Sequence, residues 1–239
     1  MTQITVSENE RNEENLMYVQ SASSEIFSTA GCTARIVKAS GRILLKINCP
    51  EYYKDAVKSE IIDKVAEIVA IKYKYDFFKG CLHVGGLSSL EREILFTSLI
   101  AADLEDDKRY AFDKFKCNDE IAIDGTYNFR LKPLKNKWCE VADCVPQCFL
   151  NTQLKEFISY LLENKKKRVY IDDGRVYDWH YRRLKRSSLL DGESAKIVRE
   201  VLLSNCGEVE LSGQIPEEDE FYLREYYSDK IIFSNGKIN

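Results

Sequence analysis

Three cysteines in one short segment are the first residues whose types and spacing could support chemistry. Cys139, Cys144 and Cys148 lie close together and suggest a metal or redox centre. Zinc sites usually combine two short Cys-x-x-Cys-type pairs. Here Pro146 lies between two of the thiols, no histidine is near, and a fourth ligand is missing. Free cysteine behaves as a small hydrophobe. We therefore predict core cysteines and no metal site, and extend this to the isolated Cys32, Cys49, Cys81, Cys117 and Cys206.

The histidines and one glycine-rich loop are the other candidates for catalysis. His83 and His180 are the only histidines, and histidine is the commonest general base. Neither has a serine or carboxylate partner in a motif, so we predict loop or surface positions. The run from Gly85 to Ser89 precedes a predicted helix, whose N-terminus could meet a phosphate. It lacks the glycine spacing and lysine of a P-loop. We predict no catalytic residue and no cofactor from motifs.

Basic residues are the one marked asymmetry of the sequence. The stretch from Lys155 to Arg186 holds ten Lys and Arg residues (155, 165–168, 175, 182, 183, 185, 186) against five Asp and Glu residues (156, 163, 172, 173, 178). Aromatic residues and a histidine interleave with its second half, from Tyr177 to Tyr181. This mixture suits phosphate contact with base stacking, or an anionic membrane surface. The alternative is a solvated face whose long side chains cover apolar neighbours.

From this excess we predict one anion-binding positive face. Arg130 and Lys132 of the central stretch add to the basic residues described above. The predicted set is Arg130, Lys132, Lys166, Lys167, Arg168, Arg182, Arg183 and Arg186.

Composition limits the class of protein. The chain of 239 residues is 44% hydrophobic and 31% charged, as in soluble globular proteins. Its formal net charge of -4 argues against a generally basic nucleic-acid binder. No apolar run approaches the roughly 20 residues that span a bilayer. The polar, acidic N-terminus does not resemble a signal peptide. We expect a cytoplasmic protein with reduced thiols.

Hydrophobic periodicity predicts the elements that must position these residues. Alternating runs predict strands at 3–7, 33–38 and 42–48, the last two joined as a hairpin, and a second hairpin at 169–171 and 175–177. Further strands are predicted at 209–211 and 231–233. Helical spacing predicts helices at 14–27, from Pro50 to 79, from Ser88 or Ser89 past 104, within 125–141 and 151–162, and at 193–203 and 216–227.

These elements predict an α+β protein. We expect a small N-terminal α/β layer with a hairpin (1–80), a helical middle (81–164) and a C-terminal mixed sheet with covering helices (165–239), which could form one continuous globule. The two helices between Ile121 and Leu162 should be the most buried, with Phe129, Trp138, Phe157 and Leu161 inside.

Two strings in that central stretch resemble the YtxC-like family of putative sporulation proteins. GTYNFRLK (125–132) is similar to the family's glycine, three residues, then Phe-Arg-Leu, and KEFISYLL (155–162) to its Glu-Phe-Ile segment. REVLLSNCGEVELSG and YYSDKIIF resemble its later helix-into-strand segment and closing strand. Thr126 and Leu154 depart from the family pattern, so the chain resembles a divergent member. The resemblance implies a cytoplasmic protein of a spore-forming bacterium and brings no catalytic residues.

Two functional hypotheses follow. The first is a non-enzymatic protein, linked to sporulation through the resemblance, that binds a protein partner. Its alternatives are nucleic acid or an anionic membrane, bound through the basic 165–186 segment. The second hypothesis is an enzyme whose site is assembled from residues far apart in sequence. A deep pocket that holds His83 or His180 beside carboxylates would favour the enzyme.

Overall fold

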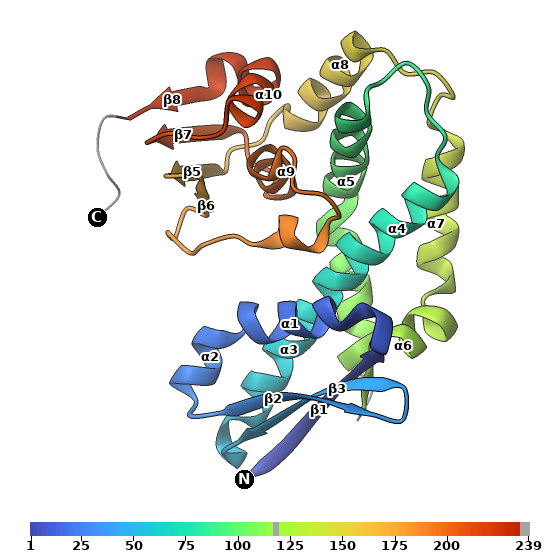
Figure 1. Cartoon of the computed structure of the whole chain (residues 1–239), viewed down its shortest axis with the longest axis vertical. Coiled ribbons are helices and arrows are strands. Elements are labelled where there is room, and N and C mark those ends of the chain that lie inside the picture. The colour runs from blue at the N-terminus through green and yellow to red at the C-terminus, as the bar shows by residue number, and fades with distance from the viewer. Residues whose placement is uncertain (117–119, 235–239) are drawn as a thin grey trace. The chain divides into compact units, whose positions relative to one another are not determined.

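A computed structural model describes residues 1–116 and 120–234 of the chain (Figure 1). The fold is 59% helix and 19% strand, with two mixed sheets of four strands, which confirms the α+β prediction. The chain forms two compact units, each built from two segments. Unit 1 comprises 1–74 and 105–141, and unit 2 comprises 75–104 and 142–239. The boundaries predicted from the sequence stay a prediction.

Unit 1 is built on a sheet with strand order β2-β3-β1-β4, in which β4 is parallel to β1 and the other pairs are antiparallel. Its strands are β1 (Thr2–Asn9), β2 (Thr33–Ala39), β3 (Arg42–Cys49) and β4 (Ile121–Ala122). The predicted hairpin is confirmed, since Ala39 pairs with Arg42 across a two-residue turn. Ser40 and Gly41 both have positive φ, as the tight turns that suit twisted strands require.

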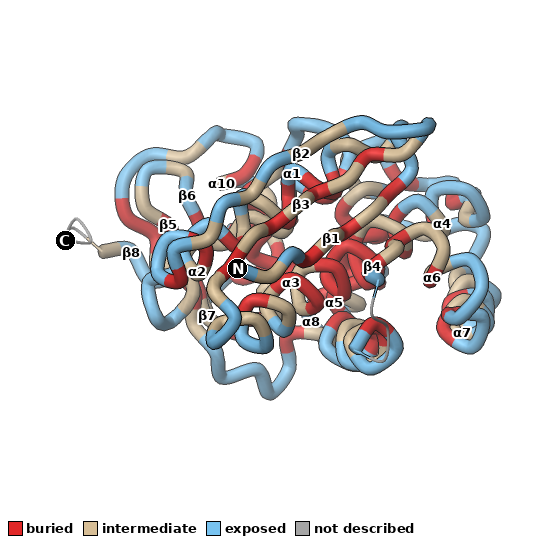
Figure 2. Tube along the Cα trace, turned by 90° about the horizontal axis from the view of Figure 1, so that it is seen from below, coloured by how far each residue is buried: buried red, intermediate tan, exposed pale blue. Residues whose placement is uncertain are grey.

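Helices supply the rest of unit 1. They are η1 (Glu10–Asn12), α1 (Glu13–Ala22), α2 (Ser24–Thr29), η2 (Glu51–Tyr53), α3 (Lys54–Ile68), the π-helical η3 (Val69–Tyr73), α6 (Ile123–Arg130) and α7 (Lys132–Asp143). Burial alternates along β3, and Ile43, Leu45 and Ile47 are fully buried (Figure 2). The apolar face of α3, from Val57 to Ile68, is buried as its spacing predicts.

A buried ion pair lies in the core of unit 1. Lys74 Nζ is 2.7 Å from Asp107 Oδ2, and the two side chains are 0% and 1% exposed. Trp138 Nε1 donates to the same oxygen at 2.8 Å, and Lys137 Nζ donates to Asp107 Oδ1 at 3.0 Å. Lys74 Nζ also lies over the Trp138 ring, 5.9 Å from its centroid. Asp107 therefore both neutralises a buried ammonium group and accepts the hydrogen bond of the Trp138 indole N–H.

Unit 2 is built on a sheet with order β6-β5-β7-β8, in which β5, β7 and β8 are parallel and β6 is antiparallel to β5. Its strands are β5 (Arg168–Asp172), β6 (Arg175–Tyr177), β7 (Glu208–Ser212) and β8 (Ile231–Phe233). Its helices are α4 (Lys74–Cys81), the first part of α5 (Ser89–Lys116), α8 (Asn151–Leu162), η4 (Arg186–Leu189), α9 (Lys196–Leu203), α10 (Glu217–Tyr227) and η5 (Ser228–Lys230). The predicted second hairpin and partly parallel sheet are confirmed.

Local capping explains where α5 begins. Ser88 Oγ accepts from the backbone N–H of Glu91, and Glu91 Oε2 accepts from the backbone N–H of Ser88. This reciprocal capping box satisfies two N–H groups that the helix leaves unpaired. The predicted cap at Ser88 is confirmed.

The prediction about the most buried helices is wrong. Every residue of α9 from Ile197 to Leu203 is buried, whereas α7 buries only Leu134 and Trp138. Trp138 is inside as predicted, but Phe129 is 80% exposed. The helix α6 buries Ile123 and Thr126, and Leu131 just after its end is fully buried, so Phe129 lies off this buried face. Phe157 and Leu161 of α8 are half-buried.

Candidate functional site

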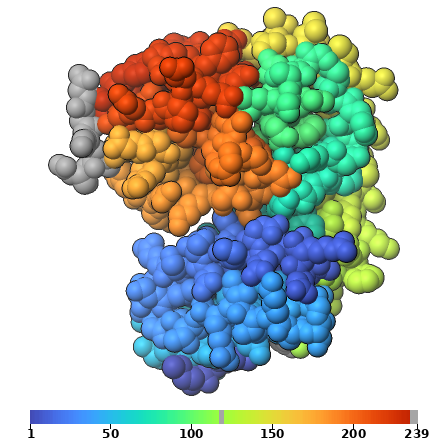
Figure 3. Space-filling model, viewed as in Figure 1, coloured from blue at the N-terminus to red at the C-terminus, as the bar shows by residue number. Residues whose placement is uncertain are grey.

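The loop after β6 displays an unusual set of aromatic side chains at the surface of unit 2. Trp179 is 59% exposed and Tyr181 is 54% exposed, and His180 between them is exposed as predicted. The Trp179 and His180 rings lie 3.4 Å apart between centroids. Large apolar rings are normally buried, so their exposure together needs an explanation. Figure 3 shows the orange atoms of this part of the chain at the surface.

Asp178 holds this loop in one conformation. Its Oδ1 accepts from the backbone N–H of both His180 and Arg182 at 2.9 Å. Its Oδ2 accepts from Arg182 Nε at 2.9 Å. These hydrogen bonds lower the pKa of Asp178 despite the opposing effect of its partial burial. Tyr181 has a φ of 60°, an uncommon conformation for a bulky residue, and its ring stacks on Tyr170 with centroids 4.7 Å apart. The loop is therefore preorganised.

Sheet register places the lysine run and this loop toward the same end of β5. Tyr177 at the end of β6 pairs with Tyr170 of β5, so the chain leaves β6 towards the start of β5. Lys165, Lys166 and Lys167 immediately precede β5, and all three are exposed. The surface that results is called the Trp179 surface below. It consists of Lys165, Lys166, Lys167, Trp179, His180, Tyr181 and Arg183.

Three carboxylates of the β5–β7 region and of the loop after β6 are paired with arginines. Glu208 lies 2.7 Å from Arg168 Nη2, and Glu210 lies 3.3 Å from Arg168 Nη1. Asp178 lies 2.7 Å from Arg182. Lys165, Lys166, Lys167 and Arg183 have no ion pair among the residues that the structure describes. The local charge left over is positive on a chain whose formal net charge is -4.

The eight residues predicted for an anion-binding face thus have different roles. Lys166, Lys167 and Arg183 present free cations within the described part of the chain. Arg168 and Arg182 form ion pairs with the carboxylates described above. Arg186 Nη1 donates to the Leu203 carbonyl at 3.3 Å. Arg130 and Lys132 belong to unit 1, at the end of α6 and the start of α7, and both are exposed. The single face that would join all eight stays a prediction.

His83 lines a pocket of unit 2 of about 490 Å³, together with Lys79, Arg92, Glu93 and the loop that leads into α5. This is the arrangement that would favour an enzyme. Glu93, however, accepts a hydrogen bond from Tyr75 and forms an ion pair with Arg199, whose Nη2 lies 3.5 Å away. Burial raises the pKa of Tyr75, and the hydrogen bond to Glu93 raises it further, so the phenol stays a donor.

Arg199 is a buried partner of Glu93, which lines this pocket. Its side chain is 1% exposed and its Nη1 donates to the Asp191 carbonyl at 2.7 Å, while Nε donates to Thr97 at 3.4 Å. Its position on α9 within an apolar stretch gave no signal of this role in the sequence. No hydrogen bond between His83 and Glu93 occurs in the described ranges, where Tyr75 and Arg199 are the partners of Glu93.

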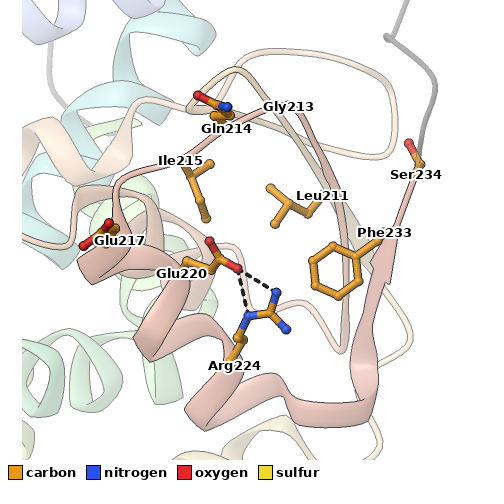
Figure 4. A pocket seen from close by; sticks show the side chains of 9 residues that line it. All are labelled: Leu211, Gly213, Gln214, Ile215, Glu217, Glu220, Arg224, Phe233 and Ser234. Atoms are coloured by element: carbon orange, nitrogen blue, oxygen red, sulfur yellow. Dashed lines mark hydrogen bonds and ion pairs between the residues drawn. The ribbon is translucent and has the colours of Figure 1, made fainter.

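A second pocket of about 610 Å³ lies at the carboxyl ends of β7 and β8, where ligands bind in many parallel sheets. Figure 4 shows Leu211, Ile215 and Phe233 around it, with Glu220 and Arg224 on α10. Arg224 Nη2 donates to Glu220 at 2.6 Å and its guanidinium lies 4.8 Å from the Phe233 ring centroid. The Glu220 carboxylate and the Arg224 guanidinium therefore neutralise each other, and we infer no reaction from this pair.

The core interpretation of the clustered cysteines is wrong. Cys139, Cys144 and Cys148 are exposed, as is Cys81. Cys139 lies on α7, which buries only Leu134 and Trp138, and Cys144 and Cys148 lie in the segment that follows the end of α7 at Asp143. Cys49 and Cys206 are buried as predicted, and Cys32 is half-buried. Cys117 lies outside the described residues. Within 1–116 and 120–234, no group of three His, Cys, Asp or Glu residues could hold a metal ion.

Comparison with protein-family models, curated proteins and solved structures gives no match. The resemblance to the YtxC-like family therefore stays a prediction. In the described part of the chain, no helix has the length and apolar character needed to cross a membrane.

Proposed function

We propose that this protein is a binding protein for single-stranded nucleic acid, which it contacts through the Trp179 surface. The observation that carries the proposal is the exposure of Trp179 and Tyr181 on a fixed loop, toward the same end of β5 as lysines that have no ion pair within residues 1–116 and 120–234. The assignment to the cytoplasm and the link to sporulation belong to the same proposal. The first is supported by the polar N-terminus and the family resemblance, and the second by the resemblance alone.

Exposed rings supply the base contacts. Bases in single strands stack on aromatic side chains, and each such stack contributes about 1–3 kcal/mol with little dependence on sequence. Trp179 and Tyr181 offer such faces, while Asp178 and the Tyr170 stack hold the loop that carries them. A ring held in place before binding loses little conformational entropy when a base stacks on it.

Free cations supply the phosphate contacts. Lys165, Lys166, Lys167 and Arg183 are exposed, and Glu208 and Asp178 are paired with Arg168 and Arg182. Backbone phosphates would therefore meet net positive charge. An anionic membrane would bind the same lysines, but it would not require stacked rings in a rigid loop. A base in a duplex is stacked already, which favours the single strand.

The test is a fluorescence-anisotropy titration of the whole protein with a fluorescein-labelled 20-nucleotide single strand, as DNA and as RNA, across a salt series. Lys166→Glu/Lys167→Glu should weaken binding and reduce the salt slope by about 0.7 for each phosphate that is no longer neutralised. Trp179→Ala should weaken binding roughly tenfold, because one stack is removed, and leave the salt slope unchanged.

Matched controls lie in unit 1. Arg11→Glu/Arg35→Glu reverses two exposed charges, and Tyr52→Ala removes an aromatic ring that is 80% exposed. Neither change should alter affinity. No binding to either single strand at low salt, or equal losses in variants and controls, would overturn the proposal. Binding to anionic vesicles in preference to both strands would also overturn it.

A further inference from the structure

Cys32 and Cys49 face each other across the β2–β3 hairpin of unit 1. Thr33 pairs with Asn48, so the next step of the antiparallel register brings Cys32 opposite Cys49. Directly opposed residues in such a pair have Cα atoms about 4.5–5.5 Å apart. Disulfides need roughly 4.4–6.8 Å between the same atoms. The backbone therefore permits a bond without rearrangement.

Both side chains point to the same face of the sheet. Cys49 is buried on the inner face of β3, in the alternation that also buries Leu45 and Ile47. Cys32 is two residues from Ala34, which pairs with Ile47 and is likewise half-buried. Each thiol is close enough to contribute to the pKa shift of the other, so the two sulfur atoms lie near each other.

We propose that Cys32 and Cys49 form a reversible disulfide, a redox modification site of unit 1 that is separate from the Trp179 surface. The oxidant is a low-molecular-weight disulfide such as glutathione disulfide. The thiolate of Cys32, the less buried residue, attacks one sulfur of that disulfide and releases one glutathione thiolate, which takes up a proton. The Cys49 thiolate then attacks Cys32 Sγ and releases the second glutathione. Two electrons pass from the cysteines to the glutathione pair.

Burial slows the reaction of the reduced pair with the oxidant. It raises the pKa of both thiols, which lowers the fraction of reactive thiolate. The N-terminal amino group and Lys54 act in the opposite direction on Cys49 by favouring its thiolate. Once formed, the bond joins the edge strand β2 to β3 at the open end of the hairpin, where β1 also pairs with Cys49 through Thr2.

The test uses the full chain equilibrated in glutathione redox buffers, trapped with acid, alkylated and digested with trypsin. Cleavage leaves Cys32 in Asn12–Arg35 and Cys49 in Ile47–Lys54, so each peptide carries one thiol. The expected product is the disulfide-linked pair of these peptides, with a melting temperature of the oxidised protein raised by about 5 °C. Dithiothreitol should reverse both changes.

Cys206→Ser is the matched control, since Cys206 is buried in unit 2, and it should leave the linked pair unchanged. Cys32→Ser should abolish the linked pair and the thermal shift, and Cys49→Ser should leave Cys32 as a mixed disulfide with glutathione. Two results would overturn the proposal. One is both peptides unmodified or singly glutathionylated in wild-type protein under excess glutathione disulfide. The other is a linked pair that forms only after denaturation.

Discussion

The buried carboxylate of Asp107 gives the sharpest test of how unit 1 is held together. Asp107→Asn removes a negative charge that lies 2.7 Å from Lys74, and Lys74 is 0% exposed. Its neighbour Asp106 makes an ion pair of the same 2.7 Å length with Arg109, but those side chains are 68% and 75% exposed. The two adjacent positions on α5 therefore compare a buried pair with an exposed pair at equal distance.

The expected magnitudes differ by several-fold. Breaking a buried pair by removing one partner costs about 3–5 kcal/mol, because a charge is left in a medium that solvates it poorly. An exposed pair contributes only about 0–1 kcal/mol, because water and salt screen it. Lys137, 41% exposed, can turn its ammonium to solvent and adds little to the loss. Asp107→Asn should therefore lower the free energy of unfolding by roughly 3 kcal/mol or more, and Asp106→Asn by about 0.5 kcal/mol or less.

Urea denaturation followed by tryptophan fluorescence measures this difference. In a Trp179→Phe background the remaining tryptophan is Trp138, whose indole N–H donates to Asp107 at 2.8 Å, so the signal reports on unit 1. The double variant Lys74→Met/Asp107→Asn should recover roughly half of the loss or more, because it leaves no buried ammonium to solvate. Equal effects of Asp107→Asn and Asp106→Asn, or a double variant that is less stable than Asp107→Asn, would refute the electrostatic reasoning.

Three further predictions concern unit 2. Gly86→Ala should destabilise the protein by roughly 1–3 kcal/mol in urea denaturation, because Gly86 has a φ of +85° and a Cβ would lie 2.7 Å from the Phe149 carbonyl oxygen. Gly80→Ala, in α4 with open space around it, should instead be neutral or slightly stabilising. Burial raises the pKa of Glu200 above its ordinary value of 4.5, so its contribution to stability is present at low pH and is lost as pH rises through the folded-state pKa. The free energy of unfolding measured against pH should therefore fall less steeply above pH 4.5 in Glu200→Gln than in wild type, and parallel curves would contradict this. Asp178→Ala should weaken single-strand binding while Trp179 is retained, because the loop loses its anchor, and this variant should also increase amide hydrogen exchange in that loop. Unchanged amide hydrogen exchange would show that Asp178 does not hold the loop in place.

The sequence alone determined most of the elements and their order, although it did not predict β4 or the division of the helix at 14–27 into α1 and α2. The Ala39-Ser40-Gly41 turn predicts its hairpin because positive φ is needed there, and Ser88 with Glu91 predicts the start of α5 because the two groups can cap each other. The strand at 231–233 and the helix at 216–227 follow from periodicity, which is a local property of the chain. The exposure of His83 and His180 was also predicted from the absence of motif partners.

Tertiary structure decided which charges are free and which thiols meet. The basic stretch predicts positive charge, yet only pairing across β5 and β7 shows that Arg168 is neutralised while Lys166 and Lys167, among the described residues, are not. Cys32 and Cys49 are separated by a whole hairpin, so only strand register brings them together. Phe129 lies off the buried face of α6 and is exposed, which its own residue type does not reveal. Periodicity shows which neighbours along the chain share one face of an element, whereas the partner on another element is fixed only when the chain packs.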